Sequence, residues 1–203
     1  MTLITNSSPF YKNILSTEFY QSKDTLSLAK ALLGKEIFHE TTEGILSGII
    51  VETEAYLQND KACHAYKGLT ARNAPMFGTA GTSYIYFIYG VHHCFNIVSG
   101  PNGLGEAILI RALEPKTGLD QMKKNRSKES LKDLCSGPGK LVQAMAIDKN
   151  FNGHSLTEPP LFLKQTMKEF EIIETTRIGI GKGKDEHLPY RFYIKGNKFI
   201  SKP

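Results

Sequence analysis

The stretch GIIVETEAY, residues 48–56, is typical of a β-strand bound for a hydrophobic interior, yet it contains two glutamates, Glu52 and Glu54. Burying an unpaired charge is costly, so each carboxylate must be paired, solvated at a cleft or used in chemistry. Strand side chains alternate between faces, which predicts a shared face for Ile50, Glu52, Glu54 and Tyr56. The carboxylates would lie roughly 7 Å apart along the strand. They would form either a solvated sheet edge or a pair available for acid–base chemistry.

A second charge interrupts an apolar run in AILIRALEP, residues 107–115. Arg111 stands there among isoleucines and leucines, and a buried arginine requires a carboxylate partner. Two strands that each carry charge inside an apolar run are expected to pair, which would bring Arg111 to the glutamates of residues 48–56. A structural ion pair and a catalytic one would leave the same pattern, so charge placement alone keeps both interpretations open.

The composition predicts one globular domain over residues 1–203. Of these residues 40% are hydrophobic and 22% charged, and the net charge of +5 permits an anionic partner without requiring one. The three cysteines, Cys63, Cys94 and Cys135, form no close CxxC pair, which favours a reducing compartment. The sequence shows neither a secretory signal pattern nor an apolar run of the ~20 residues that span a membrane. We therefore expect a cytoplasmic protein, or a nuclear one in a eukaryote.

The order of predicted elements indicates an α+β domain with a mainly antiparallel sheet. Residues 1–15 are expected to form a lightly ordered arm. A helix is predicted over 24–34, with Asp24 as its N-cap and Gly34 as its stop. A hairpin is expected to turn at TTEG (41–44), and a long loop is expected over 57–82. Two strands are predicted within 82–99, with a bend near Tyr89-Gly90, and another strand over 107–115. Helices are expected over 118–126 and after 136–140, and short strands at RIGI (177–180) and YRFYIKG (190–196).

Aromatic residues crowd the segment SYIYFIYG, residues 83–90. Alternation places Tyr84 and Tyr86 on one face of the strand and Tyr89 on the other. Aromatic strands commonly belong to a core. Three tyrosines within six residues also suit a planar ligand such as a nucleobase, so both interpretations stay open.

Basic residues gather after the Arg111 strand, at Lys116, Lys123, Lys124, Arg126, Lys128 and Lys132. A solvated helix face explains such a run, and so does a patch that contacts phosphates. The pentapeptide SGPGK, residues 136–140, could present backbone N–H groups and Lys140 to a phosphate. It lacks the spacing of a P-loop.

The segment VHHCF, residues 91–95, offers a metal-binding alternative. His92 and Cys94 share one strand face, and His93 lies on the other. No helical HxxxH pair, CxxC pair or zinc-deaminase pattern accompanies them, so no metal is predicted. A metallohydrolase built on these residues remains an alternative.

Seven motifs in a consistent order together resemble one family. They are ETEAY (52–56), His64, RNAPMFG (72–78), YIYFIYG (84–90), Asn96, IRALEP (110–115) and CSGPGKLVQAM (135–145). The chain resembles the alkyladenine, or 3-methyladenine, DNA glycosylases of the mammalian N-methylpurine type, as distinct from the helix-hairpin-helix type. The similarity extends over nearly the whole chain.

The resemblance implies a DNA repair enzyme that extrudes a damaged purine from duplex DNA and hydrolyses its N-glycosidic bond, leaving an abasic site. The implied lesions are 3-methyladenine, 7-methylguanine, hypoxanthine and ethenoadenine. The implied fold is a single compact domain with a curved antiparallel sheet, surrounding helices and a protruding β-hairpin. Neither a metal nor an organic cofactor is implied, double-stranded DNA is the expected partner, and a monomer suits access to long DNA.

The resemblance also assigns catalytic roles. Glu54 matches the carboxylate that orients and deprotonates the attacking water. Arg111 matches the arginine that helps to hold this water, and Ile178 matches the residue whose backbone carbonyl is its third contact. Glu52 is then expected to be structural.

The residues that match the base pocket are Tyr56, His64 and Tyr86, which sandwich the flipped base, and Asn96, which discriminates against guanine. Tyr89 matches the residue that enters the gap left in the helix. Arg126 matches a phosphate contact, to which the SGPGK segment adds Lys140.

Three residues depart from the family pattern beside the pocket and hairpin: Lys61, Cys63 and Val91. They bear on substrate range rather than on reaction type, and Cys63 predicts sensitivity to thiol reagents. Besides the metallohydrolase, a catalytically silent damage-binding protein and a purely structural fold are alternatives. The presence of both Glu54 and Arg111 favours the enzyme.

Overall fold

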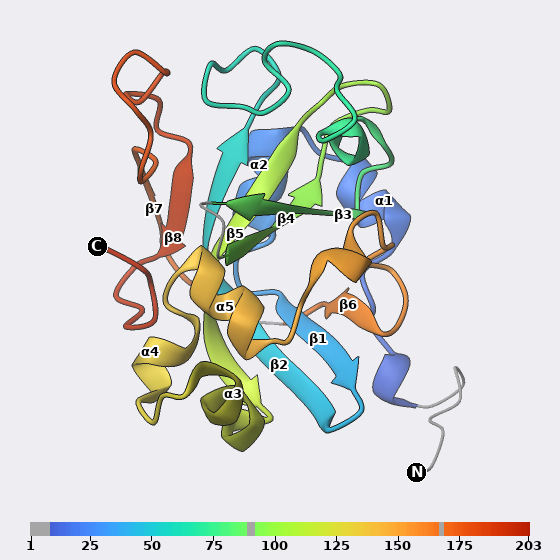
Figure 1. The fold of residues 1–203 in the computed structure, drawn as a ribbon, viewed down its shortest axis with the longest axis vertical. Helices are drawn as coiled ribbons and strands as arrows, with labels where there is room; N and C mark the ends of the chain where they lie inside the picture. Colours follow the sequence, from blue (N-terminus) through green and yellow to red (C-terminus); the bar gives the residue numbers. More distant parts are fainter. Residues whose placement is uncertain (1–8, 89–91, 167–168) are drawn as a thin grey trace.

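The computed structural model describes residues 9–88, 92–166 and 169–203. Within these residues eight strands form one curved, antiparallel sheet with five α-helices around it (Figure 1). The strands follow the order β3-β4-β5-β2-β1-β6, while β8 joins the edge of β2 and pairs with β7. This arrangement confirms the α+β class and the antiparallel sheet within a single compact domain.

The strands are β1 (Glu36–Thr41), β2 (Gly44–Tyr56), β3 (Ser83–Ile88), β4 (His92–Val98), β5 (Ala107–Thr117), β6 (Leu161–Lys164), β7 (Ile172–Thr175) and β8 (Arg191–Ile194). The α-helices are α1 (Thr17–Gln21), α2 (Thr25–Ala31), α3 (Leu119–Arg126), α4 (Leu131–Cys135) and α5 (Pro138–Ala144). Short 3-10 turns cover Pro9–Tyr11, Ala74–Phe77 and Lys149–Phe151. Among the described residues, no helix has the length and hydropathy needed to cross a bilayer.

Strand β2 is the centre of the sheet because it has three partners. It pairs with β5 along one edge. Its other edge pairs first with β1, over residues 44–49, and then with β8, over residues 52–54. The change of partner brings the C-terminal part of the chain to the glutamates of β2.

Irregular register at the middle of β2 corrects one expectation about its faces. Ile50 lies opposite Leu113 and Glu52 opposite Ala112, so Val51 is an extra residue in the ladder. A β-bulge of this kind reverses the alternation. Ile50 consequently packs in the main core, on the face opposite to Glu52, rather than sharing a face with the glutamates as predicted.

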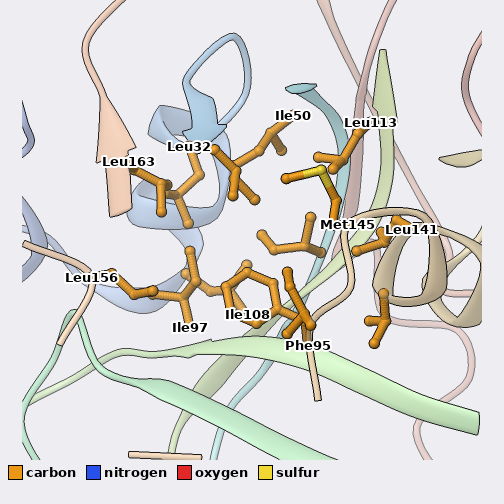
Figure 2. Packing of buried hydrophobic residues seen from close by; sticks show 14 of the residues in the cluster. Leu32, Ile50, Phe95, Ile97, Ile108, Leu113, Leu141, Met145, Leu156 and Leu163 are labelled. Atoms are coloured by element: carbon orange, nitrogen blue, oxygen red, sulfur yellow. The ribbon is translucent and has the colours of Figure 1, made fainter. Parts of the chain in front are cut away.

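The main core fills one side of the sheet, between the strands and helices α2 and α5. Figure 2 shows Leu32 after α2, Leu141 of α5 and Met145 converging on strand residues that include Ile108 and Phe95. All of these side chains are buried. Tyr56, Tyr84 and Tyr86 belong instead to a second cluster, separate from this core.

Several local predictions are confirmed. Asp24 caps α2, accepting a hydrogen bond from the N–H of Ser27 at 2.9 Å. Gly34 follows the helix with a positive φ of 77°, where a Cβ would lie 2.4 Å from the ring of Phe170. The hairpin of β1 and β2 turns between Thr41 and Gly44, as the TTEG signal predicts. The long loop before β3, the β3–β4 pair, α3, α5 and β8 also form where expected.

Other local predictions are wrong. RIGI is a loop, and the short strand lies earlier, at β7, because the N–H of Ile178 bonds to a side chain instead of to a neighbouring strand. Strand β5 continues two residues beyond Pro115, which is tolerated beside a register shift where its missing N–H is not needed. The described part of the expected arm is packed: Leu15 is buried and donates its N–H to the carbonyl of Leu163. Strand β6 was not predicted.

Candidate active site

Glu54 and Arg111 meet on the face of the sheet opposite the main core. The Arg111 Nη1 atom lies 3.1 Å from Glu54 Oε2, and the hydroxyl of Tyr56 donates to the same oxygen at 2.9 Å. Glu54 Oε1 accepts the backbone N–H of Ile178 at 2.7 Å. Glu54 is fully buried, so the alternative of a solvated sheet edge is excluded for it. Three donors hold its charge in place of water.

The protonation states of the donors fit this arrangement. Burial, together with the charge of Glu54, raises the pKa of Tyr56 well above its ordinary value, so its hydroxyl keeps its proton. Burial opposes the charge of Arg111, but Glu54 and Glu52 outweigh this effect and raise the pKa of the guanidinium. Both side chains therefore donate to Glu54 throughout the neutral range.

Glu52 is enclosed by different partners. Its Oε1 atom accepts from Arg111 Nε at 3.2 Å and from Arg191 Nη1 at 2.9 Å. The backbone N–H and hydroxyl of Ser201 bond to its two oxygens at 2.6 and 2.9 Å. Glu52 is fully buried, and its partners Arg191 and Ser201 are absent from the lining of the cavity described below. These contacts support the prediction that Glu52 is structural.

A cavity of about 470 Å³ is lined by the three residues that donate to Glu54, namely Tyr56, Arg111 and Ile178. That volume lies within the usual range for small-molecule sites. All four residues predicted to surround the base line it, together with Arg111 and Ile178. The further lining residues are Ala62, Met76, Tyr84, Cys94, Ala107, Leu109, Pro138, Gly179, Ile180, Gly181 and Lys184. The walls are thus largely aromatic and aliphatic, and the bonded partners of Glu54 form part of them.

Three aromatic rings form one wall of the cavity. The rings of His64 and Tyr86 meet edge to face, with centroids 4.5 Å apart and an interplanar angle of 75°. Tyr84 lies 5.5 Å from Tyr86, and its hydroxyl is 3.1 Å from His64 Nδ1. The alternation predicted for β3 is therefore confirmed for Tyr84 and Tyr86. The wall offers flat apolar surface with few polar atoms, as a planar ligand requires.

Two polar side chains of the pocket have defined states. Burial and the nearby charge of Arg72 lower the pKa of His64, so the ring is neutral at pH 7. Asn96 is buried, and its side-chain amide donates to the carbonyl of Tyr84 at 3.0 Å. That bond fixes the amide in the wall of the cavity.

The structure describes only some of the residues predicted to contact DNA beyond the pocket. Tyr89 and Val91 lie outside the described residues. Arg126 ends α3 and donates to the side chain of Gln143, and Lys140 lies in α5, 3.4 Å from the hydroxyl of Ser136. Neither basic residue lines the cavity, and their contact with phosphates remains a prediction.

Cys63 does not support the predicted sensitivity to thiol reagents. The thiol is buried, is absent from the lining of the cavity, and bonds to the carbonyl of Gly105. Burial raises its pKa to about 11, which leaves little thiolate at neutral pH.

Among the described residues, no group of three or more His, Cys, Asp or Glu side chains is placed to hold a metal ion.

The sequence did not lead us to predict two buried arginines of the site. Arg191 pairs with Glu52, and Arg177 lies behind Tyr56, with its guanidinium carbon 4.7 Å from the ring centroid. Each stands next to apolar residues, in RIGI and RFYI, and that local signal is the same one that identified Arg111. Their partners lie 139 and 117 residues away in the chain, so the sequence did not indicate which carboxylates they meet.

Comparison with known proteins gives a consistent result. Residues 18–198 match the family described as methylpurine-DNA glycosylase. A protein of Francisella tularensis subsp. tularensis (strain FSC 198) is 52% identical over 183 residues, which cover 88% of this chain and 94% of that protein. Relatives from Carboxydothermus hydrogenoformans and Methanoculleus marisnigri are 51% and 47% identical, covering 93% of this chain in each case and 99% and 98% of their own length. All three carry the provisional name 3-methyladenine DNA glycosylase.

Proposed function

The chain belongs to the methylpurine-DNA glycosylase family, whose members are hydrolases of N-glycosyl bonds in DNA repair, and from this we propose how its site works. It rotates an alkylated or deaminated purine out of duplex DNA into the cavity in front of Glu54. It then hydrolyses the bond between the base and the sugar and leaves an abasic site. The candidate lesions are 3-methyladenine, 7-methylguanine, hypoxanthine and ethenoadenine, and the enzyme acts as a monomer.

The observation that carries this proposal is a buried carboxylate with three donors behind an aromatic cavity. Extruding a base costs a few kcal/mol, and less when the base is damaged and poorly paired. Each aromatic contact returns about 1–3 kcal/mol by stacking. In this proposal the rings of Tyr56, His64 and Tyr86 supply such contacts, and Asn96, which lines the same cavity, discriminates against the exocyclic amino group of guanine.

The chemistry follows from what Glu54 can do at the sugar. A water held by Glu54, Arg111 and the carbonyl of Ile178 attacks C1′ as the bond from C1′ to the base nitrogen breaks. Glu54 takes the proton of the water, and the departing base takes the bonding electrons. A cationic purine leaves as a neutral molecule. A neutral purine must gain a proton as it leaves, and no residue is assigned to that role.

The direct test is single-turnover base release from duplex oligonucleotides that each carry one of the four lesions. We expect release of at least one lesion, detected as strand cleavage that requires later alkali. Lys184 lines the cavity, so borohydride should be added in a parallel reaction to trap any covalent lysine–sugar adduct. No adduct is expected. Tight lesion binding without release would instead identify a damage-binding protein.

The state of His64 predicts a pH dependence that distinguishes cationic from neutral lesions. The folded protein holds this ring neutral, so it gains charge only as the pH falls below the ordinary value of about 6.5. A charged ring would repel a cationic base, by several kcal/mol at about 5 Å and an effective dielectric constant near 20. We expect the ratio of 7-methylguanine to ethenoadenine release to fall about tenfold or more below pH 6.5.

His64→Gln is the control for this ratio, because glutamine does not titrate. Changes that arise from Glu54 or from acid hydrolysis of the lesion will appear in both proteins. Only the part of the fall that disappears in the variant belongs to His64. A ratio that follows pH identically in both proteins would show that His64 charge does not discriminate between the lesions.

A further inference from the structure

Arg177 is buried at the junction of three segments that surround the cavity. Its Nη1 atom donates to the carbonyl of Ala55, at the end of β2, at 3.1 Å. Both terminal nitrogens bond to the carboxylate of Asp60, and the Nη2–Oδ1 distance is 3.0 Å. Nη2 also lies 3.3 Å from the carbonyl of Asp185. One side chain thus joins the end of β2, the loop that leads to His64, and the loop over residues 177–185.

The guanidinium also orders the aromatic ring that reaches Glu54. Its carbon lies 4.7 Å from the centroid of Tyr56 and 5.5 Å from that of Tyr190. An arginine suits this place because its planar group stacks on rings and presents a fork of donors to a carboxylate. Tyr56 in turn donates to Glu54 Oε2.

The residue that follows Arg177 carries a second of the three donors to Glu54. The N–H of Ile178 bonds to Glu54 Oε1 at 2.7 Å, so fixing Arg177 also fixes this N–H. A second tie joins the same two loops, since the N–H of Lys61 bonds to the carboxylate of Asp185 at 2.9 Å. Two of the three donors to Glu54 are therefore adjacent in the chain to, or stacked on, Arg177.

We propose that Arg177 and Asp60 form a positioning pair that sets the angle of the Glu54 carboxylate toward the water and the sugar. The pair touches neither the base nor the water, and it acts through Tyr56 and Ile178. This inference rests on the proposed glycosylase activity. Small misplacements of a reacting group reduce rates by roughly 10- to 100-fold, which sets the scale of the expected effect.

The test compares Arg177→Lys and Asp60→Asn with the wild type in single-turnover release at saturating enzyme. Lysine keeps the charge but cannot bridge all three segments, and asparagine has the shape of aspartate without its charge. We expect the rate constant to fall about 10- to 100-fold in each variant. The double variant should be no slower than the slower single variant, because the residues act as one unit.

Two features of the measurement separate positioning from a general loss of structure. A partly unfolded sample lowers the amplitude of the release phase, whereas a misplaced carboxylate lowers its rate constant. Leu28→Ala, at a buried position of α2 in the main core, provides a destabilised control that does not line the cavity. Lys195→Ala removes an exposed charge that pairs with Glu171, and neither residue lines the cavity. Both controls should retain the wild-type rate constant within about twofold.

The outcomes are distinct. Reduced rate constants with full amplitude in Arg177→Lys or Asp60→Asn support the positioning pair. If Arg177→Lys does not fold, the isosteric Asp60→Asn variant decides alone. Unchanged rate constants with reduced amplitude or thermal stability would overturn the positioning role and leave a structural ion pair. Failure of the wild type to release any lesion would overturn the proposed function and this inference with it.

Discussion

Glu54→Gln is expected to lower single-turnover base release by roughly 10²- to 10⁴-fold, the range for losing a general base. Glutamine has the size of glutamate but cannot accept the proton of the water. It also has one acceptor oxygen for the donors that now meet two, the N–H of Ile178 on one side and Arg111 with Tyr56 on the other. Lesion binding should persist, because the rings that line the cavity remain.

The matched control is Glu52→Gln, the same substitution two residues earlier on the same strand. Both glutamates are fully buried and both bond to Arg111, so they differ mainly in their other partners. Glu54 bonds to Tyr56 and Ile178, which line the cavity, whereas Glu52 bonds to Arg191 and Ser201, which do not. Release by Glu52→Gln should stay within a few-fold of the wild type at a temperature where it is folded. Equal losses of release in the two variants would mean that the ion network as a whole, and not Glu54 as a base, is required.

The sequence predicted the elements whose causes are local. A capping aspartate, a four-residue turn and alternating tyrosines each act within a few residues, and α2, the β1–β2 hairpin and the face shared by Tyr84 and Tyr86 formed as expected. Charge inside apolar runs also gave the right partners for Arg111, because β2 and β5 carry few other charges. The four residues that family resemblance assigns to the base pocket, Tyr56, His64, Tyr86 and Asn96, all line one cavity in the structure.

What the sequence did not predict depends on distant parts of the chain. The bulge at Val51 is a feature of the register between β2 and β5. No pattern within residues 48–56 indicates the extra residue. On β5, Arg111 has no partner opposite it in the register, between Ala112 and Ile110, and this irregularity coincides with its reach to both glutamates. Arg177 was overlooked because its carboxylate partner, Asp60, lies 117 residues away in the chain and its ring partner Tyr56 ends strand β2. The carboxylate geometry is therefore a property of the assembled sheet, and not of the strand that carries it.

Glu52→Gln should show its main effect on the free energy of unfolding, with a loss of about 3–5 kcal/mol. Glu52 is the carboxylate partner of Arg191 and one of two carboxylate partners of Arg111, and both guanidiniums are buried. Removing one partner from a buried network leaves charge without compensation, which costs far more than losing a surface pair. Urea unfolding followed by circular dichroism measures the difference.

A surface pair provides the scale for that loss. Glu171→Gln removes the partner of Lys195 where both side chains are more than half exposed, and it should change the free energy of unfolding by less than about 1 kcal/mol. If Glu52→Gln were equally mild, water or other acceptors would have to replace the carboxylate, and the network would not be the rigid support inferred for β2. If the loss is large while release is preserved, the two glutamates of one strand have separate tasks. Glu52 then fixes the C-terminal segment and the arginines, which leaves Glu54 free to act on water.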